Sequence, residues 1–309
     1  MREVGVIGVG AMGLPMALRL KDRGHVVAVT DIDPARRALA ASAGLACCRN
    51  AAELARRAEV LIVAVVDATQ AASALFDSEG AFAPSPHAAP PARATGVVLC
   101  PTIGPQDVVA LADRMASLGI QTVEAPMSGG PVRARDGTMS LMVAASPEAW
   151  AAHDALLRDL SDRIIALGPR LGDGARVKLV NNLLAASHLA AAAEAMVLAQ
   201  RVGLAPSTVL DVFERSSAQS WIASDRMRRW LAGAAADGSP AAGGALPVQA
   251  ALALLAKDTR LAGEMARDGG LTLPIMGPAM QAFWAAAADG REGWDDAHLV
   301  DWIAERQRV

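Results

Sequence analysis

A glycine-rich stretch near the start of the sequence has the spacing of a phosphate-binding turn. The pattern G-x-G-x-x-G is formed by Gly8, Val9, Gly10, Ala11, Met12 and Gly13. It follows a short apolar run, residues 2–9, and opens a helical stretch, residues 11–23, which is the context in which the pattern binds a dinucleotide. The glycines allow a tight turn and a close approach of the pyrophosphate, and the start of the helix favours the negative charge. A glycine turn without a ligand is the alternative.

An acidic residue stands where such a site meets the ribose. Asp31 ends the second expected strand, 18 residues after Gly13. A carboxylate there accepts hydrogen bonds from the ribose hydroxyls and repels a 2′-phosphate, so it favours NAD and makes NADP the weaker candidate. Asp33 adds to that repulsion, although the proline after it is more typical of a helix cap. Arg36 and Arg37 act in the opposite sense because either could reach a phosphate, and Asp31 itself could serve only to cap a turn.

A lysine and an asparagine share one face of a long apolar segment. Lys178 and Asn182 are four residues apart within residues 175–202, which contain neither proline nor glycine. A buried lysine charge is costly, so a lysine at this place suggests a function. A turn with exposed amides, suited to a carboxylate, is expected at Ser128, Gly129 and Gly130. The alternatives are a lysine that extends to solvent, an asparagine bonded to the backbone and a plain glycine turn.

Strands and helices alternate through the first half of the chain. We expect strands at 2–9, 26–30, 60–66, 97–100, 121–124 and 139–144, with helices at 11–23, from Pro34 and at 105–118. This alternation predicts an α/β fold with a doubly wound parallel sheet. We take 139–144 as the last strand, and a first domain at residues 1–165.

The second half, residues 166–309, is expected to be all helical. Its longest helix, at 175–202, would span roughly 40 Å at 1.5 Å per residue and would join the two domains. Further helices are expected at 206–216, 220–234, 247–268 and 274–288, with a loop at 233–246.

Composition excludes several classes of protein. The chain has 309 residues with 53% hydrophobic and 20% charged side chains, which favours two packed domains. The net charge of −3 gives no basic excess for nucleic acid. The absence of tyrosine excludes a tyrosine general acid. With no C-x-x-C and no H-x-x-x-H, we expect no metal site, and we interpret Cys100 as a buried thiol rather than a nucleophile.

We expect a cytoplasmic protein that does not enter a membrane. The first strand begins near residue 2, which leaves no room for the apolar segment of a secretion signal. The apolar stretch 183–199 contains His188 and Glu194 and only just reaches the ~17 residues needed to cross a bilayer. A helix buried between the domains explains it better.

Four segments together resemble the β-hydroxyacid dehydrogenase family over nearly the whole chain. Residues 4–16 (VGVIGVGAMGLPM) resemble its cofactor signature, and residues 125–132 (APMSGGPV) its substrate segment, with Glu124 where aspartate is common. Residues 174–182 (GARVKLVNN) resemble its catalytic segment, and residues 255–262 (LAKDTRLA) its C-terminal lysine-aspartate motif. The resemblance implies a Rossmann-type first domain followed by an all-α domain.

The resemblance also implies roles for single residues. Lys178 would be the general acid/base and Asn182 would orient the substrate and the lysine, while residues 128–130 would bind the substrate carboxylate. Lys257 would reach over the cofactor, or would instead be a solvated lysine paired with Asp258. The remaining cofactor contacts would be made by Val65, Val66, Gln70 and Thr102. Pro101 stands where the family has serine, which removes a hydroxyl and a backbone donor.

The implied activity is hydride transfer between NAD(H) and a small β-hydroxy acid or its semialdehyde, of the 3-hydroxyisobutyrate or 2-hydroxy-3-oxopropionate type. Lys178 would move the proton, and an apolar cleft should lower its pKa toward neutrality. An imine reductase-like enzyme and a non-catalytic NAD-binding scaffold are the alternatives; Lys178 and Asn182 argue against both. Specificity could depend on Trp221, Met127 and residues 233–246, and we expect a homodimer or homotetramer.

Overall fold

The structure is a computed structural model that describes residues 1–83, 92–233 and 248–307. The chain separates into two compact units, Met1–Lys178 and Leu179–Val309. The boundary between these units falls inside one long helix, and the domain boundary expected at residue 165 stays a prediction. Each unit has a hydrophobic core of its own.

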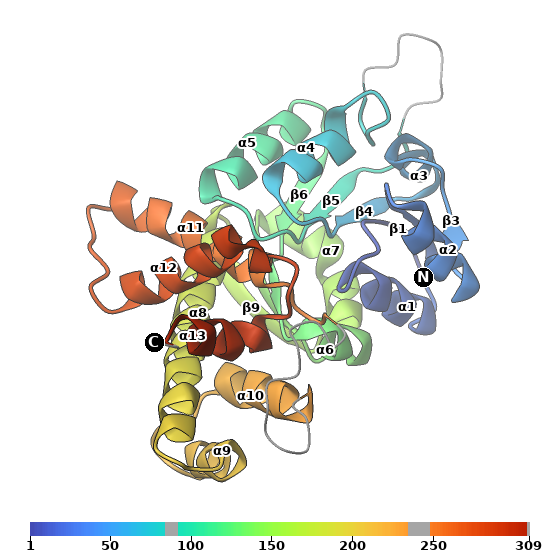
Figure 1. Ribbon diagram of the computed structural model, residues 1–309. Coiled ribbons are helices and arrows are strands. Elements are labelled where there is room, and N and C mark those ends of the chain that lie inside the picture. Colours follow the sequence, from blue (N-terminus) through green and yellow to red (C-terminus); the bar gives the residue numbers. More distant parts are fainter. Residues whose placement is uncertain (84–91, 234–247, 308–309) are drawn as a thin grey trace. The chain divides into compact units, whose positions relative to one another are not determined.

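A mostly parallel sheet forms the centre of the first unit (Figure 1). Its strands are β1 (Glu3–Ile7), β2 (Val26–Thr30), β3 (Ala46–Cys47), β4 (Val60–Val63), β5 (Gly96–Leu99), β6 (Gln121–Glu124), β7 (Met127–Ser128), β8 (Ser140–Ala145) and β9 (Arg163–Gly168). Their order is β3-β2-β1-β4-β5-β6-β8-β7, with β9 beside β8. From β3 to β6 all neighbours run parallel, and the winding direction reverses between β1 and β4. This confirms the expected doubly wound fold.

The far end of the sheet differs from the expectation in two ways. Strands β6 and β7 each pair antiparallel with β8, so the sheet is not wholly parallel. The interpretation of 139–144 as the last strand is wrong, because β9 pairs parallel with β8. Ile165 of β9 is nearly half exposed, and most of the strand is not buried. Its apolar run, residues 164–167, has only four residues, and a run that short does not distinguish a strand from a helical segment by pattern alone.

Side chains from alternate strand positions enter two different cores. In β4, Val60 and Ile62 belong to one core, and Leu61 and Val63 belong to the other. Because successive side chains point to opposite faces, an unbroken apolar run indicates a strand covered on both sides. The covering helices are α1 (Gly13–Asp22), α2 (Pro34–Ser42), α3 (Ala51–Arg57), α4 (Ala68–Phe76), α5 (Pro105–Ala116), α6 (Gly130–Asp136) and α7 (Pro147–Leu160).

The second unit is helical, as the sequence predicts. Its helices are α8 (Asp173–Arg201), which begins in the first unit, α9 (Pro206–Arg215), α10 (Trp221–Gly233), α11 (Leu252–Asp268), α12 (Met276–Ala286) and α13 (Leu299–Arg306), with short π and 3-10 turns at Ala287–Arg291 and Asp296–His298. Its core packs large side chains such as Met196, Trp230 and Phe283. The expected helix at 247–268 begins later, at Leu252, and residues 234–246 of the expected loop lie outside the described residues.

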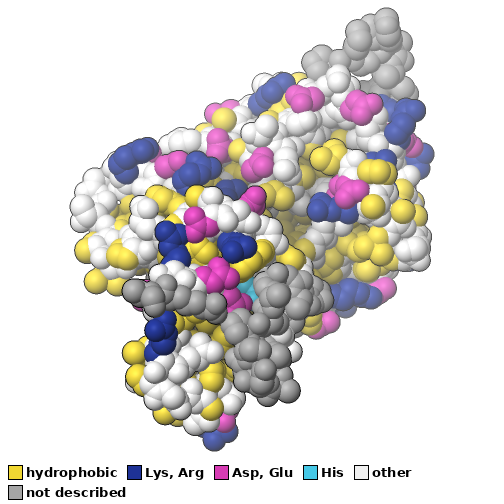
Figure 2. Space-filling view, viewed as in Figure 1, with side chains coloured by type: hydrophobic (Ala, Val, Ile, Leu, Met, Phe, Trp, Pro, Cys, Tyr) yellow, Lys and Arg dark blue, Asp and Glu magenta, His cyan; other side chains and the backbone are white. Residues whose placement is uncertain are grey.

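Helix α8 is the one helix of the described residues that is long and apolar enough to cross a membrane by length and composition alone. Half of its most apolar stretch is buried inside the protein. That burial is typical of a core helix, which passes the same test. On the face drawn in Figure 2, acidic and basic side chains are interspersed, in keeping with the small net charge.

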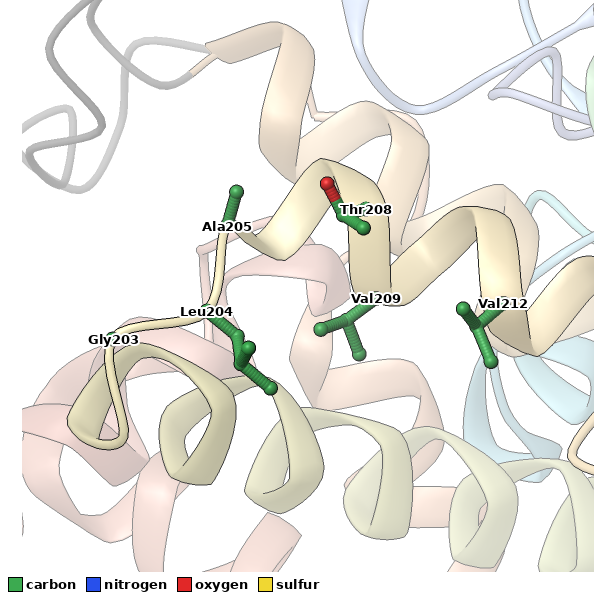
Figure 3. Close-up of a pocket in the computed structure, with 6 residues that line it drawn as sticks. All are labelled: Gly203, Leu204, Ala205, Thr208, Val209 and Val212. Atoms are coloured by element: carbon green, nitrogen blue, oxygen red, sulfur yellow. The ribbon is translucent and has the colours of Figure 1, made fainter.

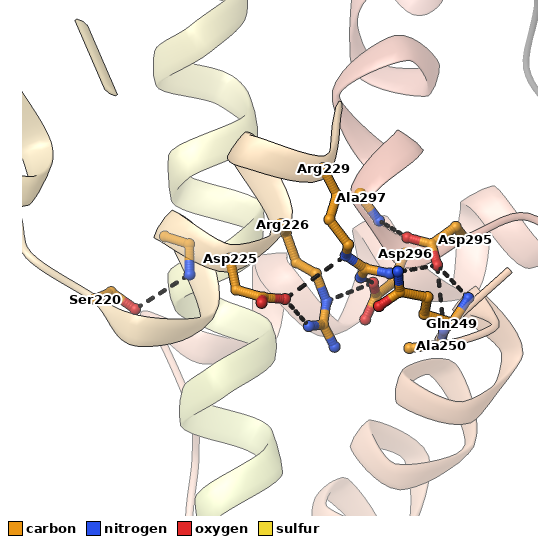
Figure 4. A network of polar contacts seen from close by, with 10 residues as sticks. Ser220, Asp225, Arg226, Arg229, Gln249, Ala250, Asp295, Asp296 and Ala297 are labelled. Atoms are coloured by element: carbon orange, nitrogen blue, oxygen red, sulfur yellow. Dashed lines mark hydrogen bonds and ion pairs between the residues drawn. The ribbon is translucent and has the colours of Figure 1, made fainter. Parts of the chain in front are cut away.

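A network of buried charges joins α10 to the segment before α13 (Figure 4). Arg226 Nε lies 2.6 Å from Asp296 Oδ1, and Arg229 contacts both Asp295 at 2.7 Å and Asp296 at 3.0 Å. Asp295 also accepts the amides of Gln249 and Ala250. Because removing one partner would leave a buried charge unpaired, this network is costly to break.

Candidate active site

The glycine turn follows β1 at the point where the strand order reverses. Gly8 has φ +89°, and a Cβ there would lie 2.7 Å from the carbonyl oxygen of Ala64. A Cβ on Gly13 would lie 1.9 Å from the carbonyl oxygen of Gly8. Both positions therefore require glycine for the close packing of turn, strand and helix. The crevice outside the carboxyl ends of β1 and β4 is where sheets of this kind bind ligands.

Asp31 closes this turn from the end of β2. Its side chain is buried, its Oδ2 accepts the amide of Val9 at 2.8 Å and its Oδ1 accepts the amide of Asp33 at 2.9 Å. Each carboxylate oxygen has a second lone pair, so hydrogen bonds to a ribose remain possible. Asp33 caps α2 by accepting the amide of Ala35, which confirms its interpretation as a helix cap.

Arg36 lies beside both the turn and the acid. Its Nη1 is 3.9 Å from Asp31 Oδ2, its Nε is 3.6 Å from Asp33 Oδ2, and a Cβ on Gly10 would meet its Nη1 at 3.4 Å. Arg37 hydrogen-bonds the carbonyl oxygen of Asp31. The glycine cradle and the carboxylate fit the pyrophosphate and ribose of a dinucleotide, and Arg36 places a positive charge near the same edge.

The other predicted cofactor residues follow neighbouring strands. Val65 and Val66 come after β4, and the amide of Val66 donates to Gln70 Oε1 at 3.2 Å. The Gln70 side chain therefore binds the backbone of the turn that precedes α4. Thr102 is half-buried and follows β5 by way of a buried Pro101. The order β2-β1-β4-β5 brings these turns along one edge of the sheet.

The serine-glycine-glycine turn is more structured than expected. Ser128 ends the two-residue strand β7, paired with Ser140, and α6 begins at Gly130. Gly129 and Gly130 have φ +133° and +77°, backbone conformations that favour glycine. No side chain caps α6, so its first amides are available to an acceptor.

Lys178 and Asn182 lie on one buried face of α8. Lys178 is 7% exposed and Asn182 is 9% exposed, whereas Val177 and Val180 are exposed. The Nδ2 of Asn182 donates to Asp258 Oδ2 at 2.6 Å, and its Oδ1 accepts from Asn181 Nδ2 at 3.0 Å. Both ends of the Asn182 amide are therefore fixed.

Lys257 pairs with Asp258, at 2.7 Å between Nζ and Oδ1. This is the alternative interpretation of that lysine, although its side chain is largely buried rather than solvated. Its reach over the cofactor stays a prediction. The sequence suggests Asp258 only as the partner of Lys257, because its bond to Asn182 joins positions 76 residues apart that no local pattern connects.

Cys100 is a buried core residue, and the part of Trp221 and Met127 in specificity stays a prediction. Burial raises the pKa of the Cys100 thiol to about 12, so it is an inert core residue, as expected. Trp221 is 53% exposed at the start of α10, and Met127 is partly buried in the sheet core. Within the described parts of the chain, no group of three His, Cys, Asp or Glu side chains could hold a metal ion.

A groove of about 500 Å³ lies at the turn between α8 and α9. Figure 3 shows Leu204 in the connecting turn, and Val209 and Val212 on the side of α9 that faces α8. None of the predicted catalytic or cofactor residues lines this groove.

The fold and the glycine turn define a dinucleotide-binding oxidoreductase. The family described as the NAD binding domain of 6-phosphogluconate dehydrogenase matches residues 3–168, and the NAD-binding domain of NADP-dependent 3-hydroxyisobutyrate dehydrogenase matches residues 172–303.

Named relatives span the whole chain. An L-threonate dehydrogenase from Cupriavidus necator is 34% identical, over 97% of this chain and 95% of that protein. A 2-hydroxy-3-oxopropionate reductase from Escherichia coli is 28% identical over 96% of both chains. The crystal structure of a 3-hydroxyisobutyrate dehydrogenase from Salmonella typhimurium is 27% identical with a TM-score of 0.85, covering 98% of this chain and all of that one.

The chain belongs to the β-hydroxyacid dehydrogenase family. It is a dehydrogenase that acts on CH–OH groups and uses NAD(P).

Proposed function

We propose that the chain interconverts a small β-hydroxy acid and its carbonyl form, with Lys178 as the general acid/base. The observation that carries this proposal is the buried Lys178, one helical turn before a buried Asn182 whose amide is held by Asp258. Lysine is almost never fully buried without a specific reason, and proton transfer is such a reason.

In this proposal each residue has one task. The turn at Ser128, Gly129 and Gly130 holds the substrate carboxylate with its backbone amides and the serine hydroxyl. Lys178 Nζ takes the proton of the substrate hydroxyl during oxidation and returns it during reduction. Asn182 keeps the hydroxyl and the lysine in line. When bound, the nicotinamide cofactor supplies the hydride acceptor or donor.

We propose NAD as the preferred cofactor. Asp31 stands at the end of β2 with lone pairs left for the ribose hydroxyls, and its charge opposes a 2′-phosphate. Arg36 weakens this opposition because it lies within 4 Å of the same carboxylate. Lys257 and Thr102 are proposed as further cofactor contacts.

The substrate class is tested with the purified chain. The names of the relatives point to L-threonate and 2-hydroxy-3-oxopropionate as first candidates. Cofactor-linked absorbance should be followed with L-threonate, glycerate, 3-hydroxyisobutyrate, 4-hydroxybutyrate and serine. Turnover of at least one hydroxy acid supports the proposal; NADH binding with no turnover of any would favour a non-catalytic scaffold.

We further propose a homodimer or homotetramer. Leu198 and Val202 near the end of α8 and Leu204 and Val212 beside the α8–α9 groove are all more than half exposed. Large exposed apolar groups gathered in this way are typical of contact surfaces. Light scattering should give a mass at least twice 31.8 kDa, and Val212→Asp should lower it.

A cytoplasmic location is also proposed. Cys47, Cys48 and Cys100 are all free thiols, which suits a reducing compartment. Cell fractionation would test it.

A further inference from the structure

Glu124 makes an unusual contact at the end of β6. It is 1% exposed, and its carboxylate accepts three backbone amides: Gly172 at 2.7 Å, Gly174 at 3.2 Å and Ala175 at 2.5 Å. These amides belong to the start of α8, whose first turn has donors with no partner inside the helix. A strand residue thus satisfies the beginning of a helix about 50 residues further along the chain.

The sequence around the helix start is shaped to admit this carboxylate. A Cβ on Gly174 would lie 2.8 Å from Glu124 Cδ and 2.9 Å from the carbonyl oxygen of Met142. Gly172 has φ +91°, and a Cβ there would lie 3.1 Å from the carbonyl oxygen of Pro105. Both glycines let the chain approach closely enough for all three bonds.

A second carboxylate at the start of α8, that of Asp173, forms ion pairs on the surface instead of accepting the backbone amides. Asp173 pairs with Arg170 at 2.9 Å and with Arg176 at 2.7 Å, both of them on the surface side. The charge of Asp173 therefore favours the positive end of the helix dipole without fixing the helix to the sheet. Of the two carboxylates, Glu124 and Asp173, it is Glu124 that accepts the backbone amides at the start of α8.

The two segments that this contact joins are next in sequence to the residues of the proposed active site. Four residues after Glu124 the chain reaches Ser128, and three residues after Ala175 it reaches Lys178. Both segments lie within the first unit. The Glu124 carboxylate therefore ties the backbone of the carboxylate-binding turn to the helix turn that carries the lysine.

We propose that Glu124 is a positioning residue for proton transfer: it holds the first turn of α8 so that Lys178 stays at a fixed distance from the turn that binds the substrate carboxylate. This inference rests on the proposed function of Lys178. A displacement of about 1 Å in a reacting group can cost as much as 10²-fold in rate. Loss of the bonds should therefore lower kcat about 10- to 100-fold, with NADH affinity within about twofold of wild type.

Two substitutions distinguish the effect of the Glu124–amide hydrogen bonds from the effect of a negative charge at the start of α8. Glu124→Gln has the same shape but turns an NH₂ group toward amide donors, so at least one bond is lost and one contact becomes repulsive. Asp173→Asn is the matched control, because it removes a negative charge at the same helix end and leaves the three amide bonds intact. Asp173→Asn should leave kcat within about twofold of wild type.

The decisive experiment is a double-mutant cycle between Glu124→Gln and Lys178→Ala, with kcat and the NADH dissociation constant measured for each protein. If Glu124 acts through Lys178, Glu124→Gln lowers kcat in the wild type and changes it by less than about twofold in the Lys178→Ala background. Equal losses in both backgrounds, or none in the wild type, would overturn the inference while leaving the role of Lys178 intact. Full activity of Lys178→Ala would instead overturn the proposed function.

A second variant covers the case in which Glu124→Gln does not fold. Gly174→Ala keeps the carboxylate but introduces a Cβ 2.8 Å from Glu124 Cδ, which forces the two apart. Gly174→Ala should likewise lower kcat in the wild type and change it by less than about twofold in the Lys178→Ala background. Gly277→Ala in α12 is the matched control, since Gly277, like Gly174, has no positive φ and its Cβ would meet nothing within 4 Å.

Discussion

Asp258 accepts a hydrogen bond of 2.6 Å from Asn182 Nδ2 and lies 2.7 Å from Lys257 Nζ. The carboxylate is buried, so the bond is charge-assisted and short. It fixes which end of the Asn182 amide is the oxygen. Asn182 can then act as an oriented group rather than a freely rotating one.

Replacing Asp258 by Asn should disturb this orientation. The Asn182 amide loses its charged acceptor, and we expect kcat/KM to fall by roughly 10-fold or more, since hydrogen bonds to charged groups contribute about 1.5–3 kcal/mol. Arg260→Met is the control, because it removes an exposed ion pair of α11, with Glu264, and leaves the acceptor of Asn182 in place. Steady-state kinetics that show equal activity for Asp258→Asn and wild type would remove Asp258 from this role.

The cofactor preference depends on Asp31. We expect kcat/KM with NAD to exceed that with NADP by at least tenfold, about 1.4 kcal/mol. Asp31→Asn should narrow the ratio because the repulsion of the 2′-phosphate is lost, whereas Arg36→Ala should widen it. Asp33→Asn tests the cap alone and should change the ratio less than Asp31→Asn. A wild-type preference for NADP contradicts the assignment.

The carboxylate site can be tested at a glycine with free space around it. Gly130 has φ +77°, and a Cβ at this position would meet no atom within 4 Å, so Gly130→Ala perturbs the backbone without a clash. We expect KM for the hydroxy acid to rise at least about tenfold while the NADH dissociation constant stays unchanged. Gly119→Ala is the matched control, with φ +73° and equally open space outside the site. An unchanged KM, or equal turnover of the matching simple alcohol, would argue against a carboxylate nest.

The buried charges of the second unit make stability depend on pH. Burial raises the pKa of Asp296 from 3.8 to about 6, against the opposing effect of Arg226. The folded state therefore binds a proton more tightly than the unfolded state, and the contribution of Asp296 to the free energy of unfolding falls as pH rises from about 4 to 6. The total change is up to about 3 kcal/mol.

Urea unfolding of the full chain at pH 4.5 and 7.5 measures this contribution. The stability of wild type minus that of Asp296→Asn should be larger at pH 4.5 than at pH 7.5. Asp211→Asn on the exposed side of α9 should show no such difference. A difference of the opposite sign would mean that the two arginines, rather than burial, control the Asp296 proton.

Local patterns predicted the parts of the fold that depend on local physics. The strands at 26–30 and 121–124 have the predicted bounds. The first is a run of apolar and β-branched residues, and the second has two β-branched residues, Thr122 and Val123, between polar ends. The glycine turn was predictable from its local spacing, because Gly13 packs against the carbonyl oxygen of Gly8 within the turn and Gly8 has φ +89°. Asp33 was predictable as a cap from the proline that follows it.

Long-range contacts were not predictable in this way. Helix α6 is short and begins with Gly130 and Pro131, which resemble a turn. The apolar run of strand β9 is only four residues long, residues 164–167, which is too short to assign by pattern alone. Glu124 stands out in the sequence only as a departure from the usual aspartate, since its partners at residues 172–175 come from a distant helix start. Asp258 is adjacent to Lys257 in the sequence, but its bond to Asn182 requires the folded unit.

The central claim is that Lys178 moves the proton, and the turnover of Lys178→Arg tests it most directly. Arginine keeps the positive charge but does not release its proton near neutral pH. We predict that kcat with the best hydroxy acid falls by roughly 10²–10⁴-fold, as for Lys178→Ala, while the NADH dissociation constant is unchanged. If Lys178→Arg keeps most of the wild-type kcat, Lys178 only supplies charge, and another group must move the proton.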